Sequence, residues 1–353
     1  MSREQHILAW TLLIALFLTV LYVLSGMLLP FVAGMALAYV LDPMVDRLVR
    51  LGLSRTTATV VVTLGIVLAL VSAVGVIVPL LVSQIGDFLG RAPGYVDALW
   101  IKLEPYVATL MAHLTPEQLA QIKAAAGEKA VGFVAILGNL LSGVASRGAA
   151  LISTLSVILI TPVVAFYLLR DWDHLVTKVD GWLPRASADT VRKLVNEIDR
   201  TLAGFARGQA TICLILAIYY ASGLTLIGLD LGLVVGMGAG LASFIPYVGA
   251  ISGLLTSLGL ALAQFDSSGP ILAVVGVFGI GQVLEGYILT PKLVGEKVGL
   301  HAVWVIFALM AGGSLFGFTG MLLAIPVAAV IGVVLRFSLK SYLNSPLYAA
   351  KKK

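Results

Sequence analysis

A carboxylate and an amide stand one helical turn apart within an apolar stretch of this chain. Gln282 and Glu285 would lie on one face of a helix through residues 270–289. A charged side chain inside a membrane helix costs on the order of 3 kcal/mol on insertion scales, and it usually faces a cavity or a partner. Glu285 is therefore a candidate ligand for a solute or coupling ion, or a proton acceptor. Alternatively, it lies at the membrane interface and pairs with Lys292 or Lys297.

Two further apolar stretches are interrupted near their middles by turn-forming residues. Residues 231–264 are interrupted at 244–249, and residues 302–337 are interrupted at 312–320, a segment with four glycines. Each half has roughly 10 to 17 residues, or about 15 to 25 Å as helix, which is too short to cross a hydrocarbon core of about 30 Å. We therefore predict two re-entrant helical hairpins.

Interrupted membrane helices often mark a transporter's binding site, because unwound backbone and half-helix ends can hold a solute or an ion there. The predicted substrate- or ion-binding residues lie at the two hairpin tips and on the span between the hairpins: Ser243, Pro246, Tyr247, Gly249, Gln282, Glu285, Ser314, Gly317, Thr319 and Gly320. The alternative is that the glycines serve close helix packing. Spacings of four residues favour that alternative at Gly232, Gly236, Gly240, Gly313 and Gly317.

The sequence gives little support for metal binding, for a disulfide, for hydrolase catalysis or for ATP-driven pumping. The four histidines are far apart, and Cys213 is the only cysteine, so we expect neither a metal site nor a disulfide. Residues 312–314 match a hydrolase nucleophile elbow only in part, and no phosphate-binding loop of an ATP-driven pump is present. We predict that the protein is not an enzyme and needs no cofactor.

The composition indicates a membrane protein. Hydrophobic residues make up 59% of the 353 residues and charged residues only 12%, against about a quarter in an ordinary soluble domain. The net charge of +5 is scattered over short loops without interleaved aromatic residues, so membrane lipid is an expected partner and nucleic acid is not. The expected fold class is an all-α integral membrane protein with several spans, two re-entrant hairpins and amphipathic helices outside the membrane.

The hydrophobic pattern divides the chain into successive regions. The expected spans are residues 7–27, a short segment 28–41 that ends at Asp42-Pro43, and then 58–82, 148–169, 210–227 and 270–289. The predicted organisation is three membrane helices in 1–82, an extracytoplasmic helical region in 83–147, a fourth membrane helix in 148–169, cytoplasmic amphipathic helices in 170–207, a transport core in 208–340 and a basic cytoplasmic tail in 341–353.

The distribution of basic residues indicates the orientation. With both termini in the cytoplasm, 18 of the 23 lysines and arginines fall on the cytoplasmic side. Cytoplasmic loops of membrane proteins carry an excess of these residues. We therefore expect a multi-pass protein with cytoplasmic N- and C-termini.

Motifs along nearly the whole chain resemble the autoinducer-2 exporter family of bacterial and archaeal membrane proteins. The residues that carry the resemblance are Pro30, Phe31, Gly34, Ala38, Tyr39 and Pro43; Thr161, Pro162 and 166–171; 244–249; Gln282, Glu285 and 291–295; and Leu300, His301, Gly312, Gly313, Gly317, Gly320 and 324–326. Ala302 stands where this family often has proline after the histidine.

The resemblance implies a transport fold, a bacterial cytoplasmic (inner) membrane location and homo-oligomers, with a pentamer as the expected assembly. It implies export of a small autoinducer-2-like signalling molecule, or exchange of sodium or lithium against protons. A non-transporting scaffold or a passive pore is the alternative from another class, and an intramembrane enzyme comes third. We further hypothesise that the two hairpins and the span with Gln282 and Glu285 form one mobile unit, which the other spans frame.

Overall fold

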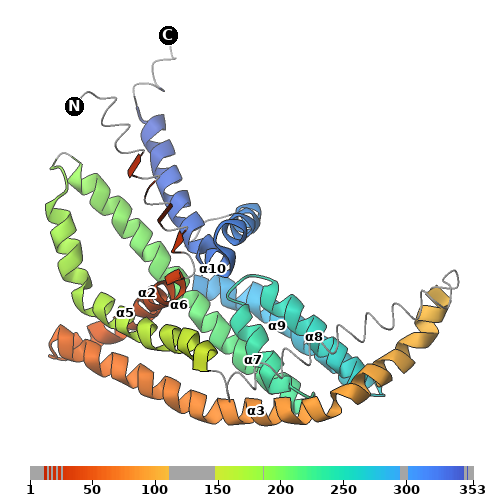
Figure 1. The fold of residues 1–353 in the computed structure, drawn as a ribbon. Coiled ribbons are helices and arrows are strands. Elements are labelled where there is room, and N and C mark those ends of the chain that lie inside the picture. Colours follow the sequence, from red (N-terminus) through yellow and green to blue (C-terminus); the bar gives the residue numbers. More distant parts are fainter. Residues whose placement is uncertain are drawn as a thin grey trace. The chain divides into compact units, whose positions relative to one another are not determined.

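The computed structural model describes residues 27–110, 148–185, 187–294, 301–345 and 348, with a few single residues between 12 and 24. These residues form helices joined by short turns, and no strand occurs among them. In chain order (Figure 1) the helices are α2 (Leu28–Arg50), α3 (Arg55–Leu110), α5 (Gly148–Gly181), α6 (Ala188–Leu226), α7 (Gly232–Ala242), α8 (Val248–Gln264), α9 (Ser268–Val283), the π-helix η2 (Leu284–Val294) and α10 (Ala302–Leu343).

The helices confirm the predicted class of an all-α membrane protein. Five segments of the described chain are long and apolar enough to cross a membrane: Leu28–Arg50, Arg55–Arg91, Ala188–Leu226, Ser268–Val294 and Val303–Leu343. The predicted span 7–27 and the part of the predicted region 83–147 beyond residue 110 lie largely outside the described residues. The domain limits proposed from the sequence therefore stay a prediction.

Several helices continue past the ends that the sequence predicts. α2 does not stop at Asp42-Pro43 but runs on to Arg50 with Pro43 inside it, which makes it 23 residues long. Proline removes only one backbone hydrogen bond from a helix, and Leu41 and Val45 are buried on either side of it. The predicted end of this segment at Asp42-Pro43 is therefore wrong, and the helix is long enough to cross a membrane.

The chain divides into two compact units. The first unit comprises Met1–Val67, Leu155–Gln209 and Leu293–Lys353, and the second comprises Leu68–Thr154 and Ala210–Lys292. The division falls within α3, α5, α6 and η2, because each of these helices contributes residues to both units.

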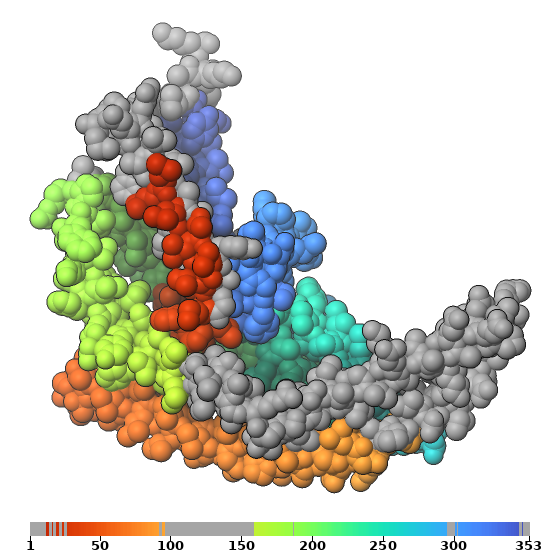
Figure 2. Space-filling view, viewed as in Figure 1, coloured from red at the N-terminus to blue at the C-terminus, as the bar shows by residue number. Residues whose placement is uncertain are grey.

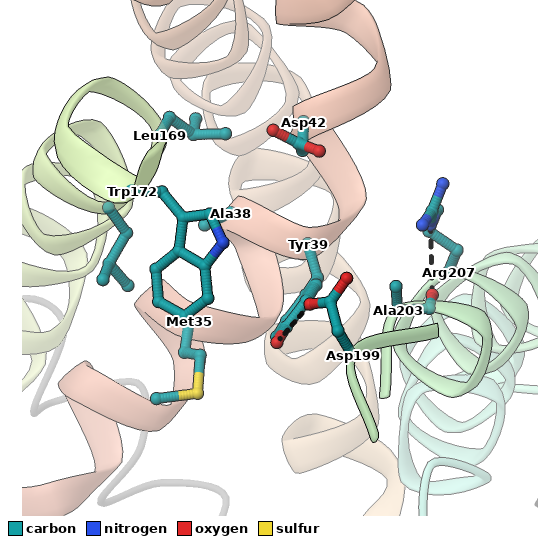
Figure 3. A pocket seen from close by; sticks show the side chains of 10 residues that line it. Met35, Ala38, Tyr39, Asp42, Leu169, Trp172, Asp199, Ala203 and Arg207 are labelled. Carbon is teal, nitrogen blue, oxygen red and sulfur yellow. Dashed lines mark hydrogen bonds between the residues drawn. The ribbon is translucent and has the colours of Figure 1, made fainter. Parts of the chain in front are cut away.

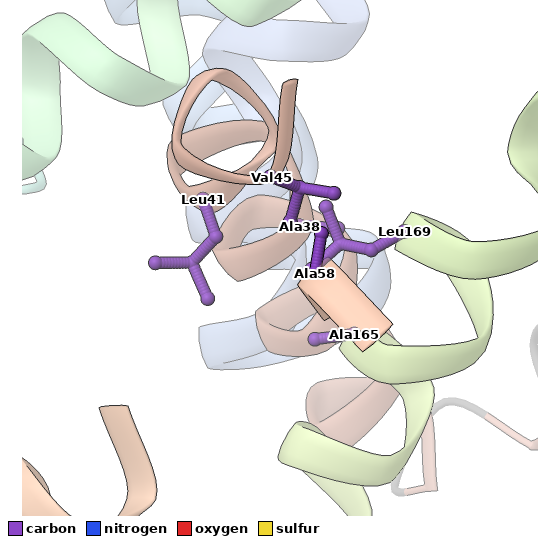
Figure 4. Close-up of a cluster of buried hydrophobic side chains, with 6 residues drawn as sticks. All are labelled: Ala38, Leu41, Val45, Ala58, Ala165 and Leu169. Atoms are coloured by element: carbon purple, nitrogen blue, oxygen red, sulfur yellow. The ribbon is translucent and has the colours of Figure 1, made fainter. Parts of the chain in front are cut away.

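The core of the first unit lies where α2, the start of α3 and α5 meet (Figure 4). Small and branched apolar side chains pack there: Ala38, Leu41, Val45, Ala58, Ala165 and Leu169. Gly34 allows α2 to approach α5 closely, since a Cβ atom at this position would lie 2.7 Å from Val164. The packing explains why apolar residues recur along one face of α2.

Arg55, the first residue of α3, connects the same three helices through its guanidinium group. It forms ion pairs with Asp42 of α2 at 3.3 Å, Asp46 of α2 at 3.6 Å and Asp173 of α5 at 2.5 Å. Its Nε also donates to the carbonyl oxygen of Leu169 at 2.9 Å. One guanidinium with several acceptors holds these three helices together, because its five donors lie in a fixed plane.

α10, also in the first unit, reverses direction at Phe316 and Gly317, whose backbone angles are not helical. A Cβ atom on Gly320 would lie 1.9 Å from the carbonyl oxygen of Gly312. Residues eight apart in a straight helix are about 12 Å apart along its axis, so this proximity requires the two halves to fold against each other. The break predicted within 312–320 is therefore present.

In the second unit, α7 and α8 pack against each other and α8 packs against α9 (Figure 1). The turn between α7 and α8 covers residues 243–247, within one residue of the predicted break. α7 has 11 residues and α8 has 17, too few for either helix to cross a membrane alone. The structure thus contains both predicted helix–break–helix arrangements, while their re-entry into a membrane stays a prediction.

The long helix α3 presents its side chains along the face seen in Figure 2, where its described residues are orange. None of its most apolar stretch is buried within the chain. A run of this length with so much uncovered apolar surface is typical of a helix that contacts lipid or another subunit.

Candidate functional site

The polar pair predicted between the two hairpins lies on the fourth described span, Ser268–Val294, at a change in helix type. Gln282 lies near the end of α9, and Glu285 is the second residue of the π-helix η2. The Gln282 Nε2 donates a hydrogen bond to Glu285 Oε2 at 3.1 Å, so the two side chains do share a face. π-helical segments are rare and often occur at functional sites.

A tyrosine that the sequence analysis did not single out lies beside this pair. Tyr220 of α6 is fully buried, and its ring stacks on Phe278 of α9 with 4.6 Å between centroids. Gly281 makes room for the ring, because a Cβ atom there would lie 2.4 Å from it. The Tyr220 hydroxyl forms no hydrogen bond within the part of the chain that the structure describes, and Gln282 directly follows the glycine that lies against this ring and its hydroxyl.

The sequence signal for Tyr220 is weak. Two adjacent tyrosines, Tyr219 and Tyr220, occur in an otherwise apolar segment. Their contacts depend on how α6 pairs with α9, and the sequence pattern of one helix does not contain that information. The contact of Tyr219 is structural, because its hydroxyl donates a hydrogen bond to the carbonyl oxygen of Val277 at 3.1 Å.

At the first hairpin tip, two of the four predicted site residues hold the turn together. The buried Ser243 Oγ donates to the carbonyl oxygen of Ala239 at 3.0 Å. Gly249 packs against the same carbonyl, since a Cβ atom there would lie 2.2 Å from it. Pro246 is half-buried. Tyr247 has a positive φ of 68° and a side chain that is 61% exposed, so it is the predicted residue here that presents its side chain outward.

At the second tip, in α10, the predicted residues differ in their surroundings. Ser314 and Gly317 are exposed, whereas Thr319 and Gly320 are buried. Gly317 has φ 58° and ψ −138°, and no described atom lies within 4 Å of where its Cβ would be. The packing role that its spacing from Gly313 suggested is therefore wrong, and Gly317 instead supplies a backbone conformation that other residues rarely adopt.

The predicted site residues fall into both compact units. Ser243, Pro246, Tyr247, Gly249, Gln282 and Glu285 belong to the second unit, and Ser314, Gly317, Thr319 and Gly320 belong to the first. The hypothesis that both hairpins and the Gln282/Glu285 span form one unit therefore differs from the observed division, in which α10 packs with α2.

The first unit also contains a pocket that the sequence analysis did not predict (Figure 3). Helices α2, α5 and α6 surround about 80 Å³, and the lining residues are Met35, Ala38, Tyr39, Asp42, Leu168, Leu169, Trp172, Asp199, Ala203 and Arg207. The Tyr39 hydroxyl donates to Asp199 Oδ1 at 3.1 Å across the pocket. Within the described residues, no group of three or more side chains is arranged to hold a metal ion.

Comparison with known proteins supports a transport role. A family model described as AI-2E family transporter matches residues 11–340. The chain is 29% identical over 318 residues to "Putative permease PerM" of Escherichia coli K12, covering 90% of this chain and 88% of that protein. It is 26% identical over 323 residues to "Putative transport protein YrrI" of Bacillus subtilis 168, covering 89% of this chain and 87% of that protein.

Proposed function

The chain belongs to the AI-2E family of transporters, and on that premise we propose that it is a secondary transporter that exports a small polar solute, an autoinducer-2-like signalling molecule, from the cytoplasm. Its family and its long apolar helices make it a multi-pass membrane protein of a transporter class. The cargo, the direction and the cytoplasmic (inner) membrane as the location are parts of the proposal.

The observation that carries the proposal is the polar group formed by Gln282, Glu285 and Tyr220. Glu285 is the only acidic residue between residues 268 and 294, so its carboxylate stands in an otherwise neutral or basic apolar segment. The amide of Gln282 and the hydroxyl of Tyr220 are suited to hydrogen bonds with the hydroxyl or carbonyl groups of a solute. A carboxylate that binds solute in one protonation state and releases it in the other would couple export to a proton gradient.

The same carboxylate favours a second candidate function, exchange of sodium or lithium against protons. Hard cations bind oxygen ligands, and the Glu285 carboxylate with the Gln282 amide carbonyl could supply two of them. Competition between a cation and a proton for one carboxylate is enough for exchange. The two candidates share the site and differ in cargo.

Flux through proteoliposomes of the purified protein tests both candidates. The test solutes are autoinducer-2, sodium and lithium, each measured with and without an imposed pH gradient. We expect saturable, gradient-driven flux of one cargo, and at least a ten-fold loss with Glu285→Gln. Glu197→Gln makes the same chemical change on the exposed face of α6 and should leave the flux unchanged.

Undiminished flux in Glu285→Gln would remove this residue from the mechanism. Flux that neither saturates nor responds to the gradient would favour the passive pore, and no flux of any cargo would favour the scaffold.

We also propose that the protein works as a homo-oligomer with both termini in the cytoplasm. The uncovered apolar side chains of α3 and the distribution of basic residues support that arrangement.

A further inference from the structure

We propose that the pocket between α2, α5 and α6 binds a small organic cation, an ammonium group attached to a short apolar or aromatic body. The pocket lies entirely in the first unit, whereas Gln282, Glu285 and Tyr220 lie in the second. This inference therefore goes beyond the proposed transport function and does not depend on it.

Each of the two carboxylates in the pocket wall uses one oxygen in a hydrogen bond within the chain. Asp199 Oδ1 accepts a hydrogen bond from the Tyr39 hydroxyl at 3.1 Å, and Asp42 Oδ1 accepts one from Arg55 at 3.3 Å. The second oxygen of each carboxylate accepts no hydrogen bond from any residue that the structure describes. The Asp42 side chain is 41% exposed. The pocket thus offers open acceptors, which a ligand with N–H donors or a positive charge can use.

The charged groups in and beside the pocket are mostly negative. Four carboxylates, of Asp42, Asp46, Asp173 and Asp199, stand in or beside the pocket with two guanidinium groups, of Arg55 and Arg207. Four negative and two positive charges leave an excess of two negative charges. Charges within a few ångströms at the edge of a protein interact strongly enough to select the sign of a ligand.

Arg207 does not neutralise the pocket as a whole. Its Nε donates to the carbonyl oxygen of Ala203 at 3.1 Å, one turn earlier in α6. In Figure 3 the Arg207 guanidinium lies on the opposite side of the pocket from Trp172. One guanidinium cannot balance both lining carboxylates, Asp42 and Asp199, and the Arg55 guanidinium is shared among Asp42, Asp46 and Asp173.

The apolar wall of the pocket favours an organic cation over a metal ion. Trp172 is 37% exposed, and Met35 and Leu168 line the pocket with it. Indole is the best of the aromatic side chains at attracting a cation over its face. A hydrated metal ion gains nothing from such a wall, whereas an ammonium ion with an apolar body can contact both the wall and the carboxylates. A volume of about 80 Å³ limits the enclosed part to a few non-hydrogen atoms.

Binding of three probes of similar shape and different charge tests the proposal. Isothermal titration calorimetry on the purified full-length protein would use benzylammonium, neutral benzyl alcohol and anionic benzoate. We expect benzylammonium to bind at least ten-fold more tightly than either of the others. Binding is measured without flux, so failure of the transport proposal leaves this result unaffected.

Matched variants then locate the site. Asp199→Asn and Asp42→Asn should each weaken benzylammonium binding by about five-fold or more, since each keeps the side-chain shape and removes the charge. Asp171→Asn is the control, because Asp171 pairs with Arg170 at 2.7 Å and does not line the pocket. Trp172→Leu should weaken binding, while Trp172→Phe should retain most of it.

Three outcomes would overturn the proposal: benzoate or benzyl alcohol binds as tightly as benzylammonium, no probe binds, or Asp171→Asn weakens binding as much as Asp199→Asn does. Thermal unfolding of every variant checks that the fold survives. Where an aspartate variant unfolds early, the comparison of Trp172→Phe with Trp172→Leu decides in its place, and equal binding by those two would also contradict the proposal.

Discussion

At the scale of single residues, glycines in this chain serve two different purposes. Gly236 and Gly240 let α7 lie against α6, because Cβ atoms there would come within 2.4 Å and 2.1 Å of backbone atoms of Ala221 and Ala217. Gly317 meets no neighbour and instead adopts a positive φ. Substitution therefore causes a steric clash at the first two positions and backbone strain at the third.

Gly240→Ala should destabilise the second unit by roughly 2 kcal/mol or more, since the added methyl group meets backbone that cannot move aside cheaply. Gly238→Ala is the matched control in the same helix, because nothing lies within 4 Å of its Cβ position. Thermal unfolding in detergent measures both. Equal unfolding temperatures for the two variants would contradict the close approach of α6 and α7.

Gly317→Ala should destabilise the reversal in α10 by roughly 1 to 3 kcal/mol, because an alanine at this φ and ψ is strained. Gly279→Ala, in the middle of α9 with open space around it, should have little effect or raise stability slightly. Unfolding temperatures of the two proteins test this difference. A Gly317→Ala protein as stable as the Gly279→Ala protein would mean that α10 does not need this conformation.

The sequence predicts some residues of the candidate site better than others. Gln282 and Glu285 could be paired from their spacing alone, because both lie on one helix. Tyr220, Tyr39 and Asp199 could not, since their partners lie on other helices and only tertiary packing brings them together. Ser243 and Gly249 were found as site candidates, but the structure gives them contacts within the turn rather than toward an open space.

At the scale of elements, breaks were predictable and helix ends were not. Glycine and proline interrupt a helix for local reasons, so the breaks near Pro246 and Gly317 could be located from the sequence. Charged residues such as Arg170 end an apolar run without ending the helix, and α5 continues to Gly181. Hydropathy therefore indicates where a helix leaves the hydrocarbon region of the membrane, whereas backbone hydrogen bonding determines where the helix ends.

Asp230, between α6 and α7, fastens α3 within the second unit. Its carboxylate pairs with Arg91 of α3 at 3.0 Å and accepts a hydrogen bond from the Tyr95 hydroxyl, while its backbone N–H donates to Gln264. Burial and the bond to Asp230 raise the pKa of Tyr95, so its hydroxyl stays protonated and able to donate. This turn therefore ties α3 to the ends of α7 and α8.

Asp230→Asn should make the amide hydrogens of residues 83–95 exchange a few-fold faster, because the ion pair with Arg91 is lost while the side-chain shape is kept. The expected increase in the exchange rate is only a few-fold, because Arg91 is largely exposed and an exposed ion pair contributes little stability. Asp87→Asn, an exposed position on the same helix, is the control. Hydrogen exchange is measured by mass spectrometry. Equal exchange rates in the two variants would show that Asp230 does not hold α3 in place.

The turn between α5 and α6 should be sensitive to acid. Two hydrogen bonds from the Arg192 guanidinium, at 2.7 and 2.8 Å, lower the pKa of Asp180 below its usual value near 3.8. A carboxyl whose pKa is lowered by folding contributes stability above its unfolded pKa and loses it as the pH falls through the folded pKa. The contribution should thus be constant from about pH 5 to 8 and shrink as the pH falls below about 4.

Thermal unfolding of the wild type and of Asp180→Asn, followed between pH 7 and pH 3, tests this expectation. The wild type should be slightly more stable at pH 7, and the difference should shrink as the pH falls below 4. Asp189→Asn provides a comparison, because Asp189 is highly exposed and pairs with Arg192 through a single 3.2 Å contact. A difference that grows on acidification would have the wrong sign for this mechanism.

For the chain as a whole, the family match and the structure describe different properties. The family match over residues 11–340 gives the transporter class, and the composition gives the membrane. Neither one predicts the two compact units, because the units combine segments that are distant in the sequence. That combination is why the second hairpin groups with α2 rather than with the first hairpin.

The proposed homo-oligomer leads to a prediction about α3. Leu64, Leu68 and Val71 lie on one face of this helix, at spacings of four and three residues, and are 55%, 57% and 63% exposed. If neighbouring copies cover this face, an arginine there must be buried without a partner in the interface. Leu68→Arg should therefore shift the assembly toward single copies of 37.1 kDa, while Leu68→Met should leave it intact.

Native mass spectrometry in a mild detergent measures the assembly directly. We expect the wild type and Leu68→Met at one common multiple of the chain mass, with five copies as the multiple implied by the family resemblance, and Leu68→Arg largely at the mass of one chain. A wild type that is monomeric under all conditions would contradict the oligomer itself. An intact assembly in Leu68→Arg would instead mean that this face of α3 contacts lipid and that the subunits meet elsewhere. A long basic side chain in contact with lipid can extend to the headgroups.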